Sequence, residues 1–443
     1  MEELALSATQ QRGSDPRTVR LDDALAQRAQ ALPGPERALV EVLAVANNPI
    51  PRTVACRAAG LDGNVPRVLS ALHRAHFVQS AGVRAGDRMG IYHDRMRESV
   101  LAQLSSERTA ALHLALGRSL STLVEEAAPG AWLFDAVRHL AAAGSLLSEP
   151  QERIAAARMH LLAGRQARQA ASFPLALRCF EDGIALLPDD CWTSDYETSL
   201  GLHAGAAEAA YLNAAWAVMD ERIAQVKANS RTLLDQMTAW VVQIDALAGR
   251  HEYIAAIDAG LAVLGLLGVH LPRDPDEASV GAAFGRALEH LTRVGQEGLA
   301  ALPDARDPQV LAAMRIQVRL CPVAFFAQQR LLALMACNLV TTSIEKGLST
   351  ATPNALALFG LILNSAGMFP VSHGWGQLAI KLLDRWEDRS LEAATRHVVF
   401  NFVCPWIVPL RSVVASSRAV FDLAQRTGDF EYGSYAAHMA TYM

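Results

Sequence analysis

Three short fragments carry the residue types that phosphoryl transfer uses, namely HDR at 93–95, LAIK at 378–381 and GDF at 428–430. A working kinase site needs a glycine-rich loop before its lysine, and its catalytic segment and metal-binding aspartate follow that lysine. Here the HDR fragment precedes the lysine, and LAIK lies within helical periodicity. We therefore interpret all three fragments as coincidences and expect no kinase chemistry in this chain itself.

Nucleotide-binding and phosphoacceptor motifs are also missing. No GxxxxGK[ST] loop occurs, and no glycine is followed directly by a lysine. Such a loop is needed because its backbone N–H groups and its lysine hold the phosphates. His93 is followed by an acidic residue but lacks the rest of a histidine-kinase box. We expect no ATP hydrolysis and no bound cofactor or metal in this chain.

Two histidine-containing groups remain as candidates for a special role. His73 and His76 lie about one helical turn apart and could offer two metal ligands, but no third ligand is near in the sequence. We interpret them as part of a solvated helix face. For His93, Asp94 and Arg95 the simplest interpretation is a helix N-cap by Asp94 beside a surface Arg95.

The element pattern is clearest in residues 163–188, where small and large apolar residues have the spacing of a tetratricopeptide repeat. A glycine sits where two helices touch closely, and the second helix ends at a proline. A weaker copy covers about residues 200–233. The packing positions that the two copies predict are Gly164, Ala176, Phe180 and Pro188 in the first, and Trp216 in the second.

Composition limits the class of protein. Of the 443 residues 51% are hydrophobic but only 6% are aromatic, and the net charge of −5 offers no bulk attraction to nucleic acid or membrane. The six cysteines contain no CxxC, which argues against a disulfide framework or a zinc cluster. No signal peptide is recognisable, and the most apolar stretch, Ala355–Phe369, falls short of the roughly 20 residues that span a bilayer. We expect a cytoplasmic protein without membrane contact.

These patterns predict an all-α fold, a TPR-like α-solenoid preceded by a small winged-helix module in which three helices are followed by a hairpin. The expected parts are a linker or remnant at 1–34, the winged-helix module at 35–104, connecting helices at 105–156, TPR-like repeats at 157–272 and further helical repeats at 273–443.

A winged helix raises the question of DNA binding. Arg67 and Arg74 share one face of its third helix, and Arg84 and Arg88 lie in the expected wing. That helix lacks a dense basic stripe, and the local charge is only mildly positive. We therefore favour a protein partner over DNA.

The sequence resembles the winged-helix and helical-repeat region of bacterial multidomain STAND/AAA-type ATPase signalling kinases. The resemblance rests on an ordered set of segments: GIYHDRMRESVLAQL at 90–104, WLFDAVRHL at 132–140, the repeat at 163–188, DDCW at 189–192, AAEAAYLN at 206–213, IDAGLAVLGLLGVHLP at 257–272, CPWIVPLR at 404–411 and TGDFEYGSYA at 427–436.

In that family a Ser/Thr kinase domain usually comes first, followed by the ATPase module, the repeats, and often a GAF domain and a histidine kinase. The resemblance implies a regulatory segment that couples partner or effector binding on the repeats to a nucleotide-binding core outside this chain, where ATP and Mg²⁺ would bind. It also places His93, Asp94 and Arg95 at a joint where they could orient neighbouring domains. The implied partners are a separate protein or covalently adjacent ATPase or kinase domains.

Two alternatives stay open. One is a Ser/Thr or histidine kinase, a description that would follow from homology to full-length relatives. The other is a STAND-type transcriptional regulator that joins an ATPase, helical repeats and a DNA-binding end. Because the final residues EYGSYAAHMATYM stop partway through an apolar helix, we expect the chain to be a piece of a longer protein.

Overall fold

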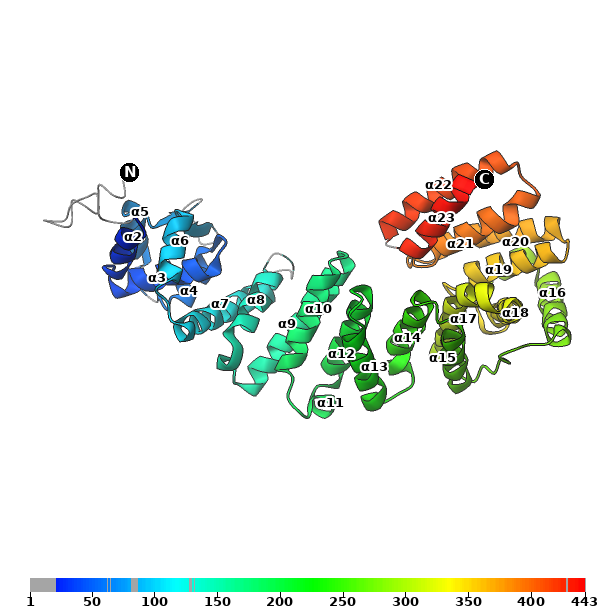
Figure 1. Ribbon diagram of the computed structural model, residues 1–443, viewed down its shortest axis with the longest axis horizontal. Coiled ribbons are helices and arrows are strands. Elements are labelled where there is room, and N and C mark those ends of the chain that lie inside the picture. Colours follow the sequence, from blue (N-terminus) through cyan, green and yellow to red (C-terminus); the bar gives the residue numbers. More distant parts are fainter. Residues whose placement is uncertain are drawn as a thin grey trace. The chain divides into compact units, whose positions relative to one another are not determined.

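Helices make up nearly all of the computed structural model, in which residues 21–61, 63, 65–80, 87–126, 130, 132–427 and 429–442 are described (Figure 1). The chain forms two units, residues 1–206 and 207–443. Most of the expected linker at 1–34 and Arg84 of the expected wing lie outside the described residues.

The first part of unit 1 combines helices with a small antiparallel sheet. Its strands pair in the order β1-β3-β2, with Ile50 opposite Met89 and Val78 opposite Ile91. Its elements are α2 (Leu21–Gln30), α3 (Gly34–Ala46), β1 (Ile50–Pro51), α4 (Arg52–Ala58), α5 (Val65–Arg74), β2 (Val78–Ser80), β3 (Arg88–Ile91) and α6 (Asp94–Leu101).

Helix α2 differs from the expectation of a linker at this position. Leu25 and Ala29 lie one helical turn apart and are both buried, and α2 packs on α6. Arg28 on the same helix donates a hydrogen bond from Nη2 to the carbonyl of Ala75 at 2.9 Å. The segment is helical because its few apolar residues share one face and find a partner helix.

The rest of unit 1 consists of helices that pack in sequential pairs, α7 with α8 and α9 with α10. Helix α7 also packs on α4 and so closes the core of the preceding module. The elements are α7 (Ser106–Glu126), α8 (Leu133–Ala143), the 3₁₀ helix η1 (Gly144–Leu146), α9 (Pro150–Gln169), α10 (Phe173–Leu186), α11 (Cys191–Ser194) and the first part of α12 (Tyr196–Leu212).

The predicted glycine contact between α9 and α10 is present. The ring of Phe180 lies against Gly164, where an added Cβ would come 2.4 Å from Cε1. The same ring meets Gly205 of α12, where an added Cβ would come 2.7 Å from Cζ. Ala176 and Phe180 are buried at 0% and 1% exposure. One aromatic ring thus joins three helices, and it can do so only because two of its neighbours lack side chains.

Among its described residues, unit 2 consists of helices joined by loops, with a parallel bridge between Asp304 and Leu348. After the end of α12 it contains α13 (Trp216–Asn229), η2 (Leu234–Gln236), α14 (Met237–Gly249), α15 (Tyr253–Leu266), α16 (Glu277–Ala300), α17 (Pro308–Ala327), α18 (Gln329–Lys346), α19 (Thr352–Ser365), α20 (Phe369–Leu382), η3 (Leu383–Arg385), α21 (Glu392–Val398), the π-helix η4 (Val399–Val403), η5 (Cys404–Trp406), α22 (Leu410–Thr427) and α23 (Phe430–Tyr442).

One helix stop recurs between paired helices of both units. The N–H of Ser172 donates to the carbonyl of Ala167 at 2.9 Å, and the intervening Ala171 has a φ of 54°. This is the Schellman arrangement, which satisfies carbonyls at a helix end. The same stop occurs four times, and each time an aromatic residue two positions later begins the next helix. The stops are at Ala171, Ala214, His251 and Gly367, and the aromatic residues that follow them are Phe173, Trp216, Tyr253 and Phe369.

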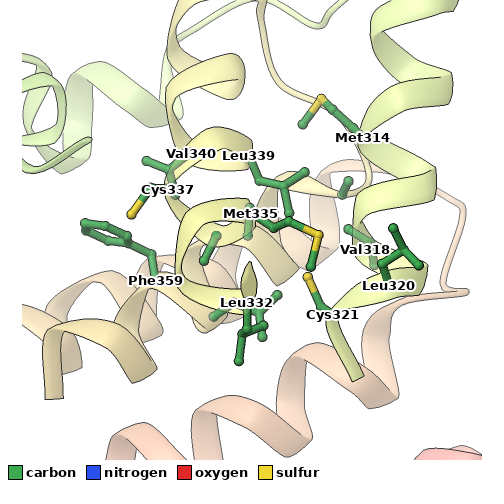
Figure 2. Packing of buried hydrophobic residues seen from close by; sticks show 14 of the residues in the cluster. Met314, Val318, Leu320, Cys321, Leu332, Met335, Cys337, Leu339, Val340 and Phe359 are labelled. Carbon is green, nitrogen blue, oxygen red and sulfur yellow. The ribbon is translucent and has the colours of Figure 1, made fainter. Parts of the chain in front are cut away.

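Unit 2 has a continuous apolar core centred on α17, α18 and α19. Figure 2 shows Cys321 of α17 and Met335 of α18 pointing toward one another, and Phe359 of α19 beside Cys337 of α18. Helix α17 is long and apolar enough to cross a membrane by length and composition, but nine of its residues are buried against neighbouring helices and it carries Arg315 and Arg319. It is the interior helix of this unit.

Replacing Gly164 by alanine is expected to lower the free energy of unfolding by about 1–3 kcal/mol, because the new methyl group overlaps the Phe180 ring. The matched control is Gly285→Ala in the exposed middle of α16, where an added Cβ meets nothing within 4 Å. This control should raise stability by up to about 1 kcal/mol through helix propensity. Urea denaturation followed by circular dichroism measures both. Equal effects of the two substitutions would contradict the contact.

Candidate functional site

The triplet at residues 93–95 lies at the junction of β3 and α6. His93 occupies the N-cap position with extended backbone (φ −136°, ψ 139°), and its side chain makes no capping hydrogen bond. Asp94 is the first helical residue, so the expected capping by Asp94 is off by one position. Its carboxylate still stabilises the helix start by facing the positive end of the macrodipole. The ring of exposed Tyr92 lies edge-on to His93 at 4.6 Å and to His76 at 5.6 Å.

His73 and His76 do not share a helix face as expected, because α5 ends at Arg74 and only His73 belongs to it. Nδ1 of His73 lies 2.8 Å from the carbonyl oxygen of Leu69, and its Nε2 lies 3.0 Å from Oγ of Ser80. His76 is in the left-handed region, with a φ of 56°. Among the residues that the structure describes, no group of three His, Cys, Asp or Glu side chains is arranged to hold a metal ion. His73 instead joins α5 to β2.

The five predicted repeat-packing residues fall into two groups. Gly164 and Phe180 meet in the contact described above, and Ala176 is buried one helical turn before Phe180. Pro188 follows the C-terminal cap of α10 and is half-buried, as expected for a helix stop. Trp216 begins α13 and is 37% exposed, with its ring 6.3 Å from that of Tyr211.

A charged cluster in unit 2 was not anticipated from the sequence. Asp245 of α14 lies 3.8 Å from Nη1 of Arg319 of α17, and its side chain is 23% exposed. Burial raises the pKa of Asp245 to about 6, while the charge of Arg319 opposes this rise. Glu431 of α23 and Glu208 of α12 add negative charge and raise it further, and Arg315 opposes them. No local sequence motif predicts this cluster, because its members come from four different helices.

Next to this cluster lies an apolar cavity of about 190 Å³. Helices α17, α19, α21 and α23 and the π-helix η4 line it, and it is partly open to the surface. None of its lining residues is an Asp, Glu, Lys or Arg. They are Cys321, Pro322, Phe325, Phe326, Leu358, Leu361, His397, Val398, Phe402, Tyr432, Tyr435, His438 and Met439.

Two irregularities of the backbone border this cavity. Pro322 lies inside α17 and supplies no N–H for the carbonyl four residues earlier. The α21 helix widens into a π-helix at Val399–Val403, a feature that is frequent at functional sites. Regular helices pack ridge into groove, so both departures leave room between neighbours. The aromatic rings of Phe325, Phe402 and Tyr435 line the space that remains.

Comparison with known proteins yields one similarity. No family model and no curated protein matches the chain. Among solved structures, the chain is similar to a Signal Transduction ATPase with Numerous Domains (STAND) protein with a tetratricopeptide repeat sensor from Pyrococcus horikoshii. The identity is 10% over 99% of this chain and 68% of that chain, with a TM-score of 0.37. This score is too low to carry an argument, so the fold rests on the helix pairs themselves.

Replacing Asp245 by asparagine is expected to change how stability depends on pH. A carboxyl group whose pKa is raised in the folded state binds more protons folded than unfolded, so its contribution to stability falls as the pH rises from about 4 to about 6. Relative to Asp245→Asn, the wild type should therefore lose up to about 3 kcal/mol between pH 4 and pH 7.

Urea midpoints at several pH values measure this difference. The control is Asp258→Asn, which removes a carboxylate whose side chain is 49% exposed. If stability depends on pH in the same way in the wild type and in Asp245→Asn, the pKa of Asp245 is the same in the folded and the unfolded chain, and the prediction is wrong.

Proposed function

We propose that this chain is the regulatory, protein-interaction segment of a bacterial signal-transduction ATPase or kinase. In this proposal a partner or effector binds the helical repeats, and binding alters a nucleotide-binding core that lies outside the chain. The ordered segments that resemble signalling ATPases support the family. The TPR-like helix pairs support the role, since helical repeats present extended surfaces to other proteins. A cytoplasmic location follows from the same proposal.

The observation that carries the proposal is an aromatic row on unit 2, formed by exposed Phe326 and half-buried Tyr253 and Tyr435. Phe326 is 56% exposed, and its ring stacks on Tyr253 at 6.1 Å and lies 6.3 Å from Tyr435. The hydroxyl of Tyr435 donates to Oε1 of Glu431 at 3.1 Å, which connects the row to the charged cluster around Asp245. Exposed aromatic rings rimmed by charged groups are typical of protein interfaces. The partner of this surface is the adjacent ATPase module or a separate protein.

We also propose that residues 35–104 form a winged-helix module. Its helix–strand–helix–helix–strand–strand order and its strand order β1-β3-β2 support this assignment. We assign it to contact with the nucleotide-binding core, with His93, Asp94 and Arg95 at the joint. Two arginines that DNA contact would use are engaged within the chain. The guanidinium of Arg88 lies 4.8 Å from the Trp132 ring, and Nε of Arg74 donates to the carbonyl of Ser70 at 3.2 Å.

The interaction role predicts no phosphoryl transfer by the purified chain, but binding to the P-loop module encoded beside it in the genome. Phe326→Ala should weaken that binding about tenfold or more, as loss of a central aromatic anchor does. The control is Phe421→Ala on α22, which removes a ring of 37% exposure outside the aromatic row.

Incubation with labelled ATP and calorimetric titration of the module test this proposal. Phosphorylation or ATP hydrolysis by the purified chain alone would overturn the assignment and favour a kinase. Equal weakening by the two phenylalanine substitutions would place the interface elsewhere.

The winged-helix assignment separately predicts that the full chain does not retard duplex DNA at low salt below about 100 μM, the weak end of ordinary non-specific binding. An electrophoretic mobility assay at several salt concentrations measures this. A salt-dependent shift at micromolar protein that Arg67→Ala weakens would instead favour the transcriptional regulator.

A further inference from the structure

The cavity of unit 2 has the size and the lining of a site for a small aromatic molecule. Its volume of about 190 Å³ exceeds the roughly 150 Å³ of an apolar cavity that holds benzene. Leu358 and Leu361 of α19 form one wall, and the rings of Phe325 and Phe402 form others. With no Asp, Glu, Lys or Arg in the lining, a charged ligand would have no partner there.

One lining residue, His397, is a polar group with a determined orientation. Nδ2 of Asn401 donates to the carbonyl oxygen of His397 at 3.0 Å, and Oδ1 of Asn401 accepts from Oγ of Ser417 at 2.7 Å. A carbonyl oxygen can only accept, so these contacts settle which atom of the Asn401 amide is the nitrogen. The same Nδ2 lies 3.3 Å from Nδ1 of His397. Nδ1 is therefore the acceptor.

A neutral imidazole that accepts at Nδ1 carries its proton at Nε2. His397 is 5% exposed, and burial lowers its pKa to about 4, so the ring is neutral at pH 7. Within the part of the chain that the structure describes, no hydrogen bond involves Nε2 of His397. Its ring neighbours are aromatic, with Phe402, Tyr432 and Tyr435 at 5.7–5.9 Å between centroids.

Because His397 lines this partly open cavity, the acceptor atom of a bound ligand can reach its Nε2–H group. The Tyr435 hydroxyl is already committed to Glu431.

We propose that this cavity binds a small uncharged aromatic molecule whose single hydrogen-bond acceptor, a carbonyl or ether oxygen, meets Nε2–H of His397. The aromatic ring of the ligand lies among Phe325, Phe402 and Tyr432, and Leu361 closes the space from α19. This site goes beyond the protein-interaction function proposed above and does not depend on it, because the cavity lies within one unit and needs no partner protein.

Acetophenone and ethylbenzene are the probes, since they have nearly the same shape and differ in one acceptor oxygen. Calorimetric titration of the full chain at pH 7.5 is expected to detect binding of both. In His397→Phe, the ratio of the ethylbenzene Kd to the acetophenone Kd should fall by about 3- to 10-fold relative to wild type, which is the contribution of one hydrogen bond.

Leu361→Trp fills the cavity and should abolish binding of both probes. Its matched control, Leu311→Trp on the exposed side of α17, should leave binding unchanged. A further measurement, by NMR, uses the unsubstituted chain and so does not depend on whether a variant folds. The ¹⁵N resonance of His397 Nε2 should shift with acetophenone and stay in place with ethylbenzene.

Three results would overturn the proposal: no binding of either probe to the wild type, an unchanged ratio in His397→Phe, or full binding in Leu361→Trp. Phe326 also lines the cavity, so the probes are titrated into the wild type and the two variants named above, without the P-loop module. A wild-type chain that binds acetophenone but not the P-loop module would therefore count against the proposed function alone.

Discussion

This structure depends on one constraint: neighbouring helices approach closely only where a glycine leaves space for a large side chain of the helix opposite. Phe180 can lie between α9 and α12 because Gly164 and Gly205 present bare backbone to its ring. In unit 2 the sizes are reversed, and Gly260 of α15 receives Leu320 of α17, where an added Cβ would lie 2.3 Å from Cδ1. Filled interiors tolerate neither a gap nor an overlap, so each large side chain needs a small one opposite.

These contact residues lie at fixed distances in sequence from the repeating helix stop. The two positions to compare lie seven residues before and nine residues after each stop. In the first helix pair they hold Gly164 and Phe180, and in the second they hold Ala207 and Ile223. The third pair, around His251, places a large residue first and a glycine second, namely Ile244 and Gly260. At the fourth stop, Gly367, both positions are glycines, Gly360 and Gly376, and the side chain of Val403 lies against each of them. The residues at the two positions therefore differ from pair to pair, which explains why a consensus reading weakens along the chain while the helix pairs continue.

The chemically distinctive parts of unit 2 lie where regular packing is interrupted. Pro322 and the π-helix at Val399–Val403 border the cavity, and the same region buries His397 and raises the pKa of Asp245. Burial acts on the two groups in opposite senses, since it favours the neutral form of each: protonated for the carboxylic acid, deprotonated for the imidazole. The imidazole of His397 is therefore neutral at pH 7 among aromatic rings, whereas Asp245, with a pKa of about 6, loses its proton just below neutral pH beside Arg319.

The sequence by itself determined the helical fold class, the first repeat with its Gly164–Phe180 contact, and the missing phosphate-binding loop, because each depends on spacing within some thirty residues. It missed α2, whose buried face is only Leu25 and Ala29, and it displaced the α6 cap by one residue because His93 and Asp94 are both plausible there. Only the tertiary structure decided the cavity, the His397 donor and the Asp245 cluster. Their members come from helices far apart in the chain, and burial, tautomer and pKa are set by neighbours that no local pattern specifies.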